Sequence, residues 1–383
     1  MELKEYRFDE VTINFDKKRI PLSGAQRKKR QGNFRYYGAQ GVIDHIDDFI
    51  FDGTYLLIAE DGENLKSKKQ NIAQVVEGQF WVNNHAHIVQ GNELCNTRYL
   101  CYLLNSMDLS GYVTGSAQPK LSQANLNAVT LFLPSITVQE RIVESLYLFD
   151  KKIAVNQKIN DNLQQQAAAI FRSWFVDCAP FGGKAPDEWE NVTLEDITAL
   201  ISRGITPKYA DDTDQIVINQ KCIRNHTIDL TLARTHTPKI INEKWLRFGD
   251  LLINSTGDGT LGRAAQVWFQ PKNLTVDSHV TIARPAKENL IFYIGLWGIL
   301  HEKEIESLHT GSTGQTELPR DRVKAMELLL PDNETLDRFN GLITPMAAAI
   351  VANQEENNRL AALRDAILPK LMSGEIDVSA IQL

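Results

Sequence analysis

The chain is 383 residues long, which is enough for two domains of ordinary size and the segments that connect them. Hydrophobic residues make up 43% of it and charged residues 23%, a balance typical of soluble globular proteins. No apolar run approaches the roughly 18–20 residues of a membrane span, and the start lacks the apolar core of a signal peptide. We therefore expect a cytoplasmic protein without a membrane partner. The net charge of −7 excludes a surface that binds phosphate everywhere.

Charges are segregated near the start of the chain. Between positions 17 and 35 every charged residue is basic, and between 36 and 63 every charged residue is acidic. This pattern predicts a basic face on an otherwise acidic body. The candidate DNA-phosphate contacts on that face are Arg27, Lys28, Lys29, Arg30 and Arg35. The alternative for this run is a solvated, flexible basic loop.

Residues 1–133 are interpreted as a first variable domain. Strand-like runs such as 55–59 and 129–133 alternate with turns rich in Gly and Asp, which predicts mixed strands. A helix is predicted over 97–109, because three leucines there share one helical face.

The next segment occurs twice, since Leu133-Pro134 reappears 197 positions later as Leu330-Pro331. The first copy, 134–180, contains a predicted helix over about 137–176. In that helix apolar residues and asparagines recur every seven positions in two series, which is typical of the a and d positions of a heptad repeat. A period near 200 residues is too long for a solenoid and indicates two copies of one large module.

The second copy, 331–383, is predicted to be less regular. A short helix is expected to end near Gly341 and a long one to begin at Pro345, a favourable first-turn residue, and to run to Met372. Those 28 or so residues correspond to roughly 42 Å. Pro369 is expected to kink the last turns and Gly374 to cap the helix.

The two repeat helices are predicted to pair with each other in antiparallel orientation, because their series match position for position. Buried asparagines at such a seam fix the register at some cost in stability. The alternative is that each helix packs on its own domain. The candidate interface residues are Ile142, Phe149, Asn156, Asn160, Leu163, Ile170, Met346, Ile350, Asn353, Asn357, Leu360 and Ile367.

Residues 181–330 are interpreted as a second variable domain, entered through a linker rich in Gly and Pro at 179–186. The two domains resemble each other in short stretches. Val82-Asn-Asn-His85-Ala-His-Ile-Val is similar to Val276-Asp-Ser-His279-Val-Thr-Ile-Ala, and 115–121 is similar to 311–318. Elsewhere they diverge, which indicates a shared frame that carries two different surfaces. The dispersed basic residues proposed as DNA contacts here are Lys208, Lys221, Arg224 and Arg263.

No arrangement typical of catalysis is recognisable. Gly257-Asp-Gly259-Thr-Leu-Gly262 fits the GxGxxG pattern of dinucleotide sites, but the residues after it predict another strand and not the helix that would bind a pyrophosphate. His85-x-His87 lacks further ligands for a metal. Cys95, Cys101, Cys178 and Cys222 have neither disulfide nor metal spacing and are expected to be buried thiols. We therefore expect a protein that does no chemistry itself.

Taken in order, these features resemble the specificity subunit of type I restriction–modification systems. The resemblance is carried by Leu133-Pro134 with Gln139, by 170–177 (IFRSWFVD) and by 367–376 (ILPKLMSGEI) at the ends of the two helices. The segment 36–44 (YYGAQGVID) in the first domain, and 204–207 (GITP) with 256–263 (TGDGTLGR) in the second, add to it. One departure is that the first domain begins without the Trp that opens the second as Glu188-Trp189.

The resemblance implies an α/β (α+β) fold with two target-recognition domains, separated by two long helices that form an antiparallel coiled coil with pseudo-twofold symmetry. Each domain would read one half of an asymmetric, interrupted DNA site, and matched lengthening of both helices would widen the spacer between the halves. Methyltransferase subunits would dock on the helices and methylate adenine, and restriction subunits would add translocation and cleavage. S-adenosylmethionine, ATP and Mg²⁺ would then belong to those partners and not to this chain.

Two other functions remain open. The first is a stand-alone DNA-binding, antirestriction or scaffold protein without methyltransferase partners, which co-purification with a methyltransferase would distinguish. The second is a nucleotide-dependent oxidoreductase based on the segment Gly257–Gly262, which a dinucleotide would stabilise against melting.

Overall fold

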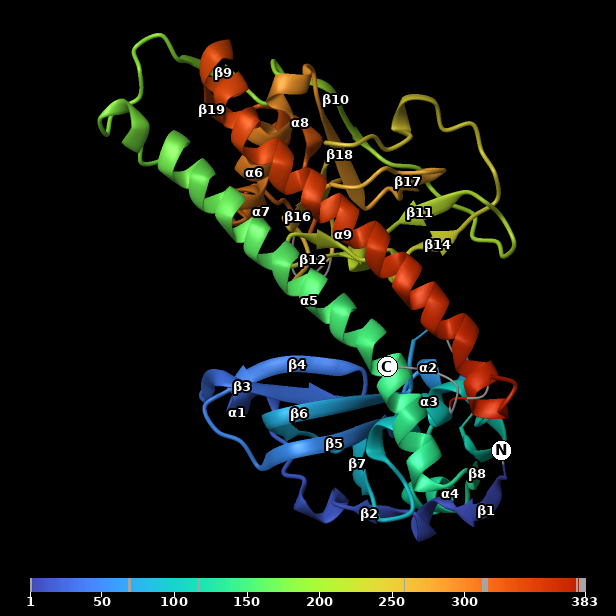
Figure 1. Ribbon diagram of the computed structural model, residues 1–383. Helices are drawn as coiled ribbons and strands as arrows, with labels where there is room; N and C mark the ends of the chain where they lie inside the picture. The colour runs from blue at the N-terminus through green and yellow to red at the C-terminus, as the bar shows by residue number, and fades with distance from the viewer. Residues whose placement is uncertain are drawn as a thin grey trace. The chain divides into compact units, whose positions relative to one another are not determined.

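A computed structural model describes residues 2–67, 70–115, 118–257, 259–311, 316–376 and 378. The chain forms two compact units, one of residues 1–153 with 358–383 and the other of residues 154–357 (Figure 1). Each unit combines a mixed sheet with helices. None of the helices in the described ranges is long and apolar enough to cross a membrane.

The first unit is built on a six-stranded sheet. Its strand order is β2-β7-β5-β6-β3-β4, antiparallel throughout except between β3 and β6. The six strands of this sheet are β2 (Thr12–Asn14), β3 (Gln31–Gly38), β4 (Gly41–Ile46), β5 (Phe51–Ala59), β6 (Ala73–Val82) and β7 (Ala86–Gly91). A separate two-stranded sheet is formed by β1 (Lys4–Arg7) and β8 (Thr130–Leu133). The short helices are α1 (Gly24–Lys28), α2 (Asn64–Ser67), α3 (Thr97–Ser106) and α4 (Gln123–Asn127).

Helix α3 covers one face of this sheet. The Asn96 side chain caps it by accepting hydrogen bonds from the amides of Arg98 and Tyr99 at 2.9 and 3.2 Å. The helix buries Tyr99, Leu100 and Leu104 against Leu56 and Ile58 of β5, so these residues form a single apolar core. The helix predicted over 97–109 is confirmed, although it ends three residues earlier, at Ser106.

The second unit contains a four-stranded sheet, β10-β18-β15-β16, and a three-stranded sheet, β14-β11-β17. The strands are β9 (Glu190–Thr193), β10 (Thr198–Arg203), β11 (Ile216–Ile218), β12 (Ile223–Arg224), β13 (Thr227–Ile228), β14 (Arg234–Thr235), β15 (Leu251–Asn254), β16 (Ala264–Gln266), β17 (Leu274–Val276), β18 (Val280–Pro285) and β19 (Glu327–Leu330). The short helices are α6 (Ile291–Leu300), α7 (Glu302–Ser307) and α8 (Arg320–Lys324).

Helix α6 is apolar on all sides and lies in the core of the second unit. Two of its glycines allow close packing on the sheet. A Cβ atom at Gly295 would lie 1.9 Å from the Oε1 atom of Gln266, and one at Gly298 would lie 2.4 Å from the Cδ2 atom of Leu251. Any larger residue at either position would push α6 away from β15 and β16.

The two domains share one frame. In the first unit β1 pairs with β8 so that Lys4 faces Leu133, and in the second β9 pairs with β19 so that Glu190 faces Leu330. A short helix lies just before β8 in the first unit, at 123–127, and just before β19 in the second, at 320–324. The two helices are 197 residues apart. The pairs β2–β7, β5–β7 and parallel β3–β6 correspond to β10–β18, β15–β18 and parallel β11–β17. The sequence echoes therefore reflect a common strand topology.

Two long helices, α5 (Ile136–Phe175) and α9 (Asn333–Ser373), follow strands β8 and β19 respectively. The helix predicted over 137–176 is confirmed. The predicted break in the second copy is wrong, because α9 continues through Gly341 and Pro345 for 41 residues, or about 62 Å. Gly374 has a φ of 78°, as expected of a cap.

Packing explains why α9 tolerates an internal proline. Pro345 removes one backbone hydrogen bond and its ring crowds the carbonyl of Gly341, at a cost of about 3 kcal/mol. The residues around it, Phe339, Ile343 and Ile350, are fully buried in the core of the second unit. Burial of each such side chain contributes about 1.5–3 kcal/mol, which outweighs the local loss.

Asparagines join α5 and α9 in the second unit. The Asn156 Nδ2 atom donates to the Asn357 Oδ1 atom at 2.9 Å, and the Asn353 Nδ2 atom donates to the Asn160 Oδ1 atom at 2.8 Å. From the first contact to the second, the residue number increases in α5 and decreases in α9, so the two helices run antiparallel. Asn156 and Asn353 are equivalent in the repeat, as are Asn160 and Asn357, so one hydrogen bond occurs twice. The predicted pairing is confirmed at these positions.

The apolar seam residues pack into the domain cores. Ile142 is buried in the core of the first unit and Ile350 in that of the second. The partly buried Ile367 packs against the first core, and Leu163, Ile170 and Met346 pack against the second. Phe149 and Leu360 are half-buried. The helices thus pack both on each other and on the domains. Mutual pairing and packing on a domain, which the sequence left open as alternatives, both occur.

The cysteines are free thiols, of which Cys95, Cys178 and Cys222 are buried and Cys101 is half-buried. Burial raises the pKa of the Cys95 and Cys101 thiols to about 12, so both stay protonated at neutral pH.

Candidate nucleic-acid interface

The basic run of the first domain folds as helix α1 and not as a flexible loop. Ser23 and Gln26 form a capping box in which the Ser23 Oγ atom accepts from the Gln26 amide at 3.3 Å. The Gln26 Oε1 atom in turn accepts from the Ser23 amide at 2.8 Å. These two bonds fix the start of the helix and set the directions of the basic side chains that follow.

Two of the predicted phosphate contacts are held by acidic residues. The Arg27 Nε atom lies 2.8 Å from the Asp44 Oδ2 atom, and the Arg30 Nε atom lies 2.8 Å from the Asp47 Oδ1 atom. Burial raises the pKa of Asp44, but hydrogen bonds from Gln31 and Arg27 outweigh it and lower the pKa. The predicted separation of a basic face from an acidic body therefore does not hold at Arg27 and Arg30, because the β3–β4 hairpin brings Asp44 and Asp47 beside them.

The other basic residues of this run differ in their surroundings. Lys28 and Lys29 are exposed, and the described residues place no ion pair on either. The Arg35 Nη2 atom donates to the Glu77 carbonyl at 2.7 Å, and its guanidinium lies 5.6 Å from the Tyr37 ring centre. Lys28 and Lys29 are therefore the available cations of α1.

In the second domain the predicted contacts are separate. Lys208, Lys221 and Arg224 are exposed, and Arg224 ends strand β12 and pairs with Thr227 of β13. Arg263 is half-buried, and its Nη2 atom donates to the Gly259 carbonyl at 2.8 Å. This bond closes the glycine-rich turn on itself, so Arg263 is engaged within the protein.

The GxGxxG segment forms a turn between strands, as expected. Gly257 and Gly262 have φ values of 99° and 84°, and strand β16 begins two residues after the turn. A Cβ atom at Gly262 would lie 2.9 Å from the Cα atom of Glu306, so this glycine permits close packing of α7. Asp258 lies outside the described residues.

The His-x-His pair divides into an exposed and a buried histidine. The His87 Nδ1 atom lies 2.6 Å from the Asp16 Oδ2 atom, and its Nε2 atom lies 2.8 Å from the Leu121 carbonyl. Burial opposes the charged forms, but this hydrogen bond outweighs it, lowering the pKa of Asp16 and raising that of His87. Among the described residues, no group of three His, Cys, Asp or Glu side chains could hold a metal ion.

A feature that sequence reasoning noted without assigning a role is a corner present in both domains. We define the histidine corner as residues 60–62, 83–85, 114–115 and 118–121 in the first unit and 255–257, 277–279, 310–311 and 316–318 in the second. The His85 Nδ1 atom lies 2.6 Å from the Asp61 Oδ2 atom, and the His279 Nδ1 atom lies 2.7 Å from the Thr256 Oγ1 atom. Residues 116–117 and 312–315 lie outside the described ranges.

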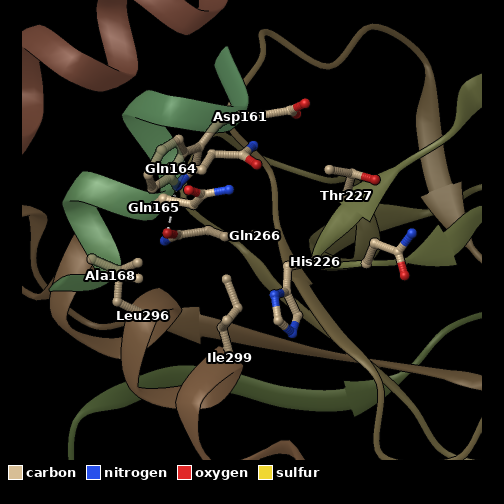
Figure 2. A pocket seen from close by; sticks show the side chains of 11 residues that line it. Asp161, Gln164, Gln165, Ala168, His226, Thr227, Gln266, Leu296 and Ile299 are labelled. Atoms are coloured by element: carbon tan, nitrogen blue, oxygen red, sulfur yellow. Dashed lines mark hydrogen bonds between the residues drawn. The ribbon is translucent and has the colours of Figure 1, made fainter. Parts of the chain in front are cut away.

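A cavity of about 450 Å³ lies within the second unit between α5 and the domain (Figure 2). Asp161, Gln164 and Gln165 line it from the helix. On the opposite side, Gln266 donates to the Gly249 carbonyl at 2.9 Å and His226 lies 3.2 Å from Glu302. Gln266 and His226 are thus engaged within the domain, and we assign no ligand to this cavity.

The sequence comparisons all find similarity to specificity proteins of type I restriction–modification systems. The sequence profile of the type I restriction modification DNA specificity domain matches residues 2–165. A Haemophilus influenzae protein assigned as a type I restriction enzyme specificity subunit is 23% identical over 94% of both chains. The MjaIX specificity subunit of Methanocaldococcus jannaschii is 27% identical over 74% of this chain and 70% of that protein.

A solved structure shares the fold. The S subunit of a type I restriction–modification system from M. genitalium superposes with a TM-score of 0.53 over 97% of this chain and 96% of that chain, at 12% identity. The segment that matches the sequence profile, residues 2–165, covers the first domain and most of α5. The internal repeat extends the same strand topology to the second domain. The chain is therefore similar to type I restriction–modification specificity subunits along nearly its whole length, and its first domain and most of α5 match the DNA specificity domain of those systems.

Proposed function

We propose that this chain reads an asymmetric, bipartite DNA site for a type I restriction–modification assembly, with one half-site bound by each domain. The observation that carries this proposal is the duplicated frame. Both domains have the same strand topology and the same closing ladder, yet their exposed cations differ in position. A shared frame with unlike surfaces suits two contacts of one kind made to two different sequences.

Exposed lysines and arginines support a role in phosphate binding. Lys28 and Lys29 in the first domain, and Lys208, Lys221 and Arg224 in the second, are exposed and form no ion pair with another described residue. Each phosphate contact releases counterions and contributes about 0.9 to the slope of log affinity against log salt. Replacing Lys28 and Lys29 with alanine is expected to lower that slope by up to about 1.8.

The partners complete the activity. Methyltransferase subunits dock on the two helices and methylate adenine, and restriction subunits add translocation and cleavage in the cytoplasm. We assign S-adenosylmethionine, ATP and Mg²⁺ to those subunits and no catalytic step to this chain. Calorimetric titration of the purified chain with each of the three is expected to show no binding, and binding of any of them contradicts this assignment.

The decisive experiment maps methylated adenines in a methylation-free host that expresses the chain with a methyltransferase from the same source. The expected result is one interrupted motif with two specific parts. Exchanging residues 8–129 for those of a relative is expected to change one part and leave the other. A single continuous motif, or failure to co-purify with the methyltransferase, would favour a stand-alone DNA-binding protein. Lys184→Ala, an 80% exposed lysine of the linker, is the control for binding measurements.

A further inference from the structure

The histidine corners of the two domains are built by the same backbone hydrogen bonds. They join the turn after β5 or β15 to the turn before β7 or β18 and to the segment before α4 or α8. In the first unit these are Glu60 N to His85 O at 2.9 Å and Leu121 N to Glu60 O at 2.8 Å; in the second they are Ser255 N to His279 O and Leu318 N to Ser255 O, both at 2.8 Å.

The histidine has the same local setting in both corners. The amide of His85 donates to the Asn83 Oδ1 atom at 2.8 Å, and the amide of His279 donates to the Asp277 Oδ1 atom at 2.9 Å. These are Asx turns, which fix the backbone so that the imidazole projects outward. The side chain of His85 is 51% exposed, and His279 is also exposed.

The residue that contacts Nδ1 of each imidazole, Asp61 for His85 and Thr256 for His279, determines which ring nitrogen of the neutral imidazole carries the hydrogen. Asp61 as a carboxylate only accepts, and Thr256 donates its own hydrogen to the Gln220 Oε1 atom at 3.0 Å. Both therefore accept from Nδ1–H. The Nε2 atom is then left on the exposed side of the ring in both domains.

The imidazoles have the same setting in both corners, but the charged residues beside them differ. Lys120 lies 3.3 Å from Glu60 in the first unit, whereas the Arg203 Nη1 atom lies 2.6 Å from the Glu317 Oε1 atom in the second. Each corner thus holds a cation, but on a different element. Two half-sites of different sequence present the same sugars and phosphates at every position, so a side chain kept the same in both domains suits a backbone contact.

We propose that His85 and His279 each bind a DNA backbone phosphate through Nε2, one in each half-site. This inference rests on the proposed DNA-reading function and locates one contact within each domain. Because Nδ1–H is already donated to the protein, Nε2 donates to a phosphate oxygen only when the imidazole is protonated. DNA binding is therefore expected to tighten as the pH falls from 8 to 6.

Several charged groups face the two imidazoles and share in this pH dependence. Asp61 and Asp277 are direct neighbours, and burial raises the pKa of Asp277. Other charged groups at the corners are Glu60, Lys120, Arg19 and Lys66 in the first unit and Arg203 and Glu317 in the second.

The test uses the complex of this chain with its methyltransferase subunits and a fluorescent duplex carrying the motif mapped above. At pH 6, where the contact requires the protonated imidazole, His85→Gln and His279→Gln are each expected to lower the salt slope by up to about 0.9, and the double variant by up to about 1.8. The tightening between pH 8 and pH 6 is expected to shrink with each substitution. His226→Gln is the matched control, since His226 is 48% exposed, also contacts a carboxylate, and lies outside the corners.

The outcomes separate three cases. Unchanged slope and pH dependence in variants that melt like the wild type would overturn the phosphate contact. A changed sequence preference at constant slope would assign base reading to these histidines and also overturn it. If the wild-type complex itself shows no specific, salt-dependent binding, the proposed function fails and not this inference alone.

A second measurement covers variants with a lowered melting temperature. Uncharged methylphosphonate linkages are placed one at a time along each half-site of the duplex. One linkage per half-site is expected to weaken wild-type binding and to have no further effect on the corresponding histidine variant. Equal losses for wild type and variant at every linkage would contradict the proposal.

Discussion

Replacing Asn156 with alanine tests whether the amide seam holds α5 and α9 together in the second unit. Asn156 is fully buried and its Nδ2 atom donates to the Asn357 Oδ1 atom at 2.9 Å and to the Glu356 Oε2 atom at 2.7 Å. A net hydrogen bond contributes about 1 kcal/mol, and a buried acceptor that loses its donor costs about 1–3 kcal/mol. We expect Asn156→Ala to lower the local unfolding free energy by about 2–3 kcal/mol.

A double-mutant cycle isolates the contact itself. Asn357→Ala alone is expected to cost about 1–2 kcal/mol, and the double variant is expected to cost less than the two losses together by about 1 kcal/mol. Asn353 and Asn160, the equivalent pair in the repeat, are expected to give the same coupling because their Nδ2–Oδ1 distance is 2.8 Å.

Hydrogen exchange of α5 and α9 amides measures these costs locally, which avoids assuming that both units unfold together. The exposed neighbour Gln157 is the control, and its replacement with alanine is expected to change the opening free energy by less than about 0.5 kcal/mol. Strictly additive losses for both asparagine pairs would refute the reasoning, because the amides would then not interact across the seam.

Three further predictions concern the rest of the chain. Pro345→Ala is expected to restore a helical hydrogen bond and slow amide exchange in α9, a gain of up to about 3 kcal/mol, because Pro345 is exposed and packs little; faster exchange contradicts this. The raised pKa of His87 means that its protonated form stabilises the fold below about pH 6.5 and loses this effect as the pH rises through the folded pKa. His87→Gln is therefore expected to cost more in urea unfolding at pH 6 than at pH 9, and equal costs would exclude the charged pair with Asp16. Alanine variants of Asp150 and Arg364, whose side chains are 33% and 23% exposed and lie 2.6 Å apart, are expected to couple by about 0.5–1 kcal/mol, and a coupling of zero shows a pair of no energetic consequence.

The helices and their pairing were predictable because heptad patterns are local. Apolar residues and asparagines every seven positions define a seam wherever the helix lies, so Asn156 and Asn160 could be placed there from spacing alone. The start and end of α5 were predicted to within one residue for the same reason. The continuity of α9 through Pro345 was missed, since the buried residues that outweigh the proline are contributed by contacts with the second domain.

The candidate DNA surface was predictable only in part. Sequence alone identifies Arg27 and Arg30 as basic, but the partner of each depends on the register of the β3–β4 hairpin, which brings Asp44 and Asp47 beside them. Lys28 and Lys29 lie on the other side of a short helix and stay exposed. Charge along a chain predicts composition well and surface potential poorly, because sheet pairing is non-local.

What the sequence by itself determined is the plan of the protein: a duplicated frame, two heptad helices that pair, and a resemblance to a known family. These follow from periodicity and repeated motifs, which are readable without contacts. Only the tertiary structure decided which charges remain available and that the two echoed segments meet at one corner in each unit. The physical reason is that hydrogen bonds such as Glu60 N to His85 O and Ser255 N to His279 O join residues distant in sequence, and only the folded sheets bring them together.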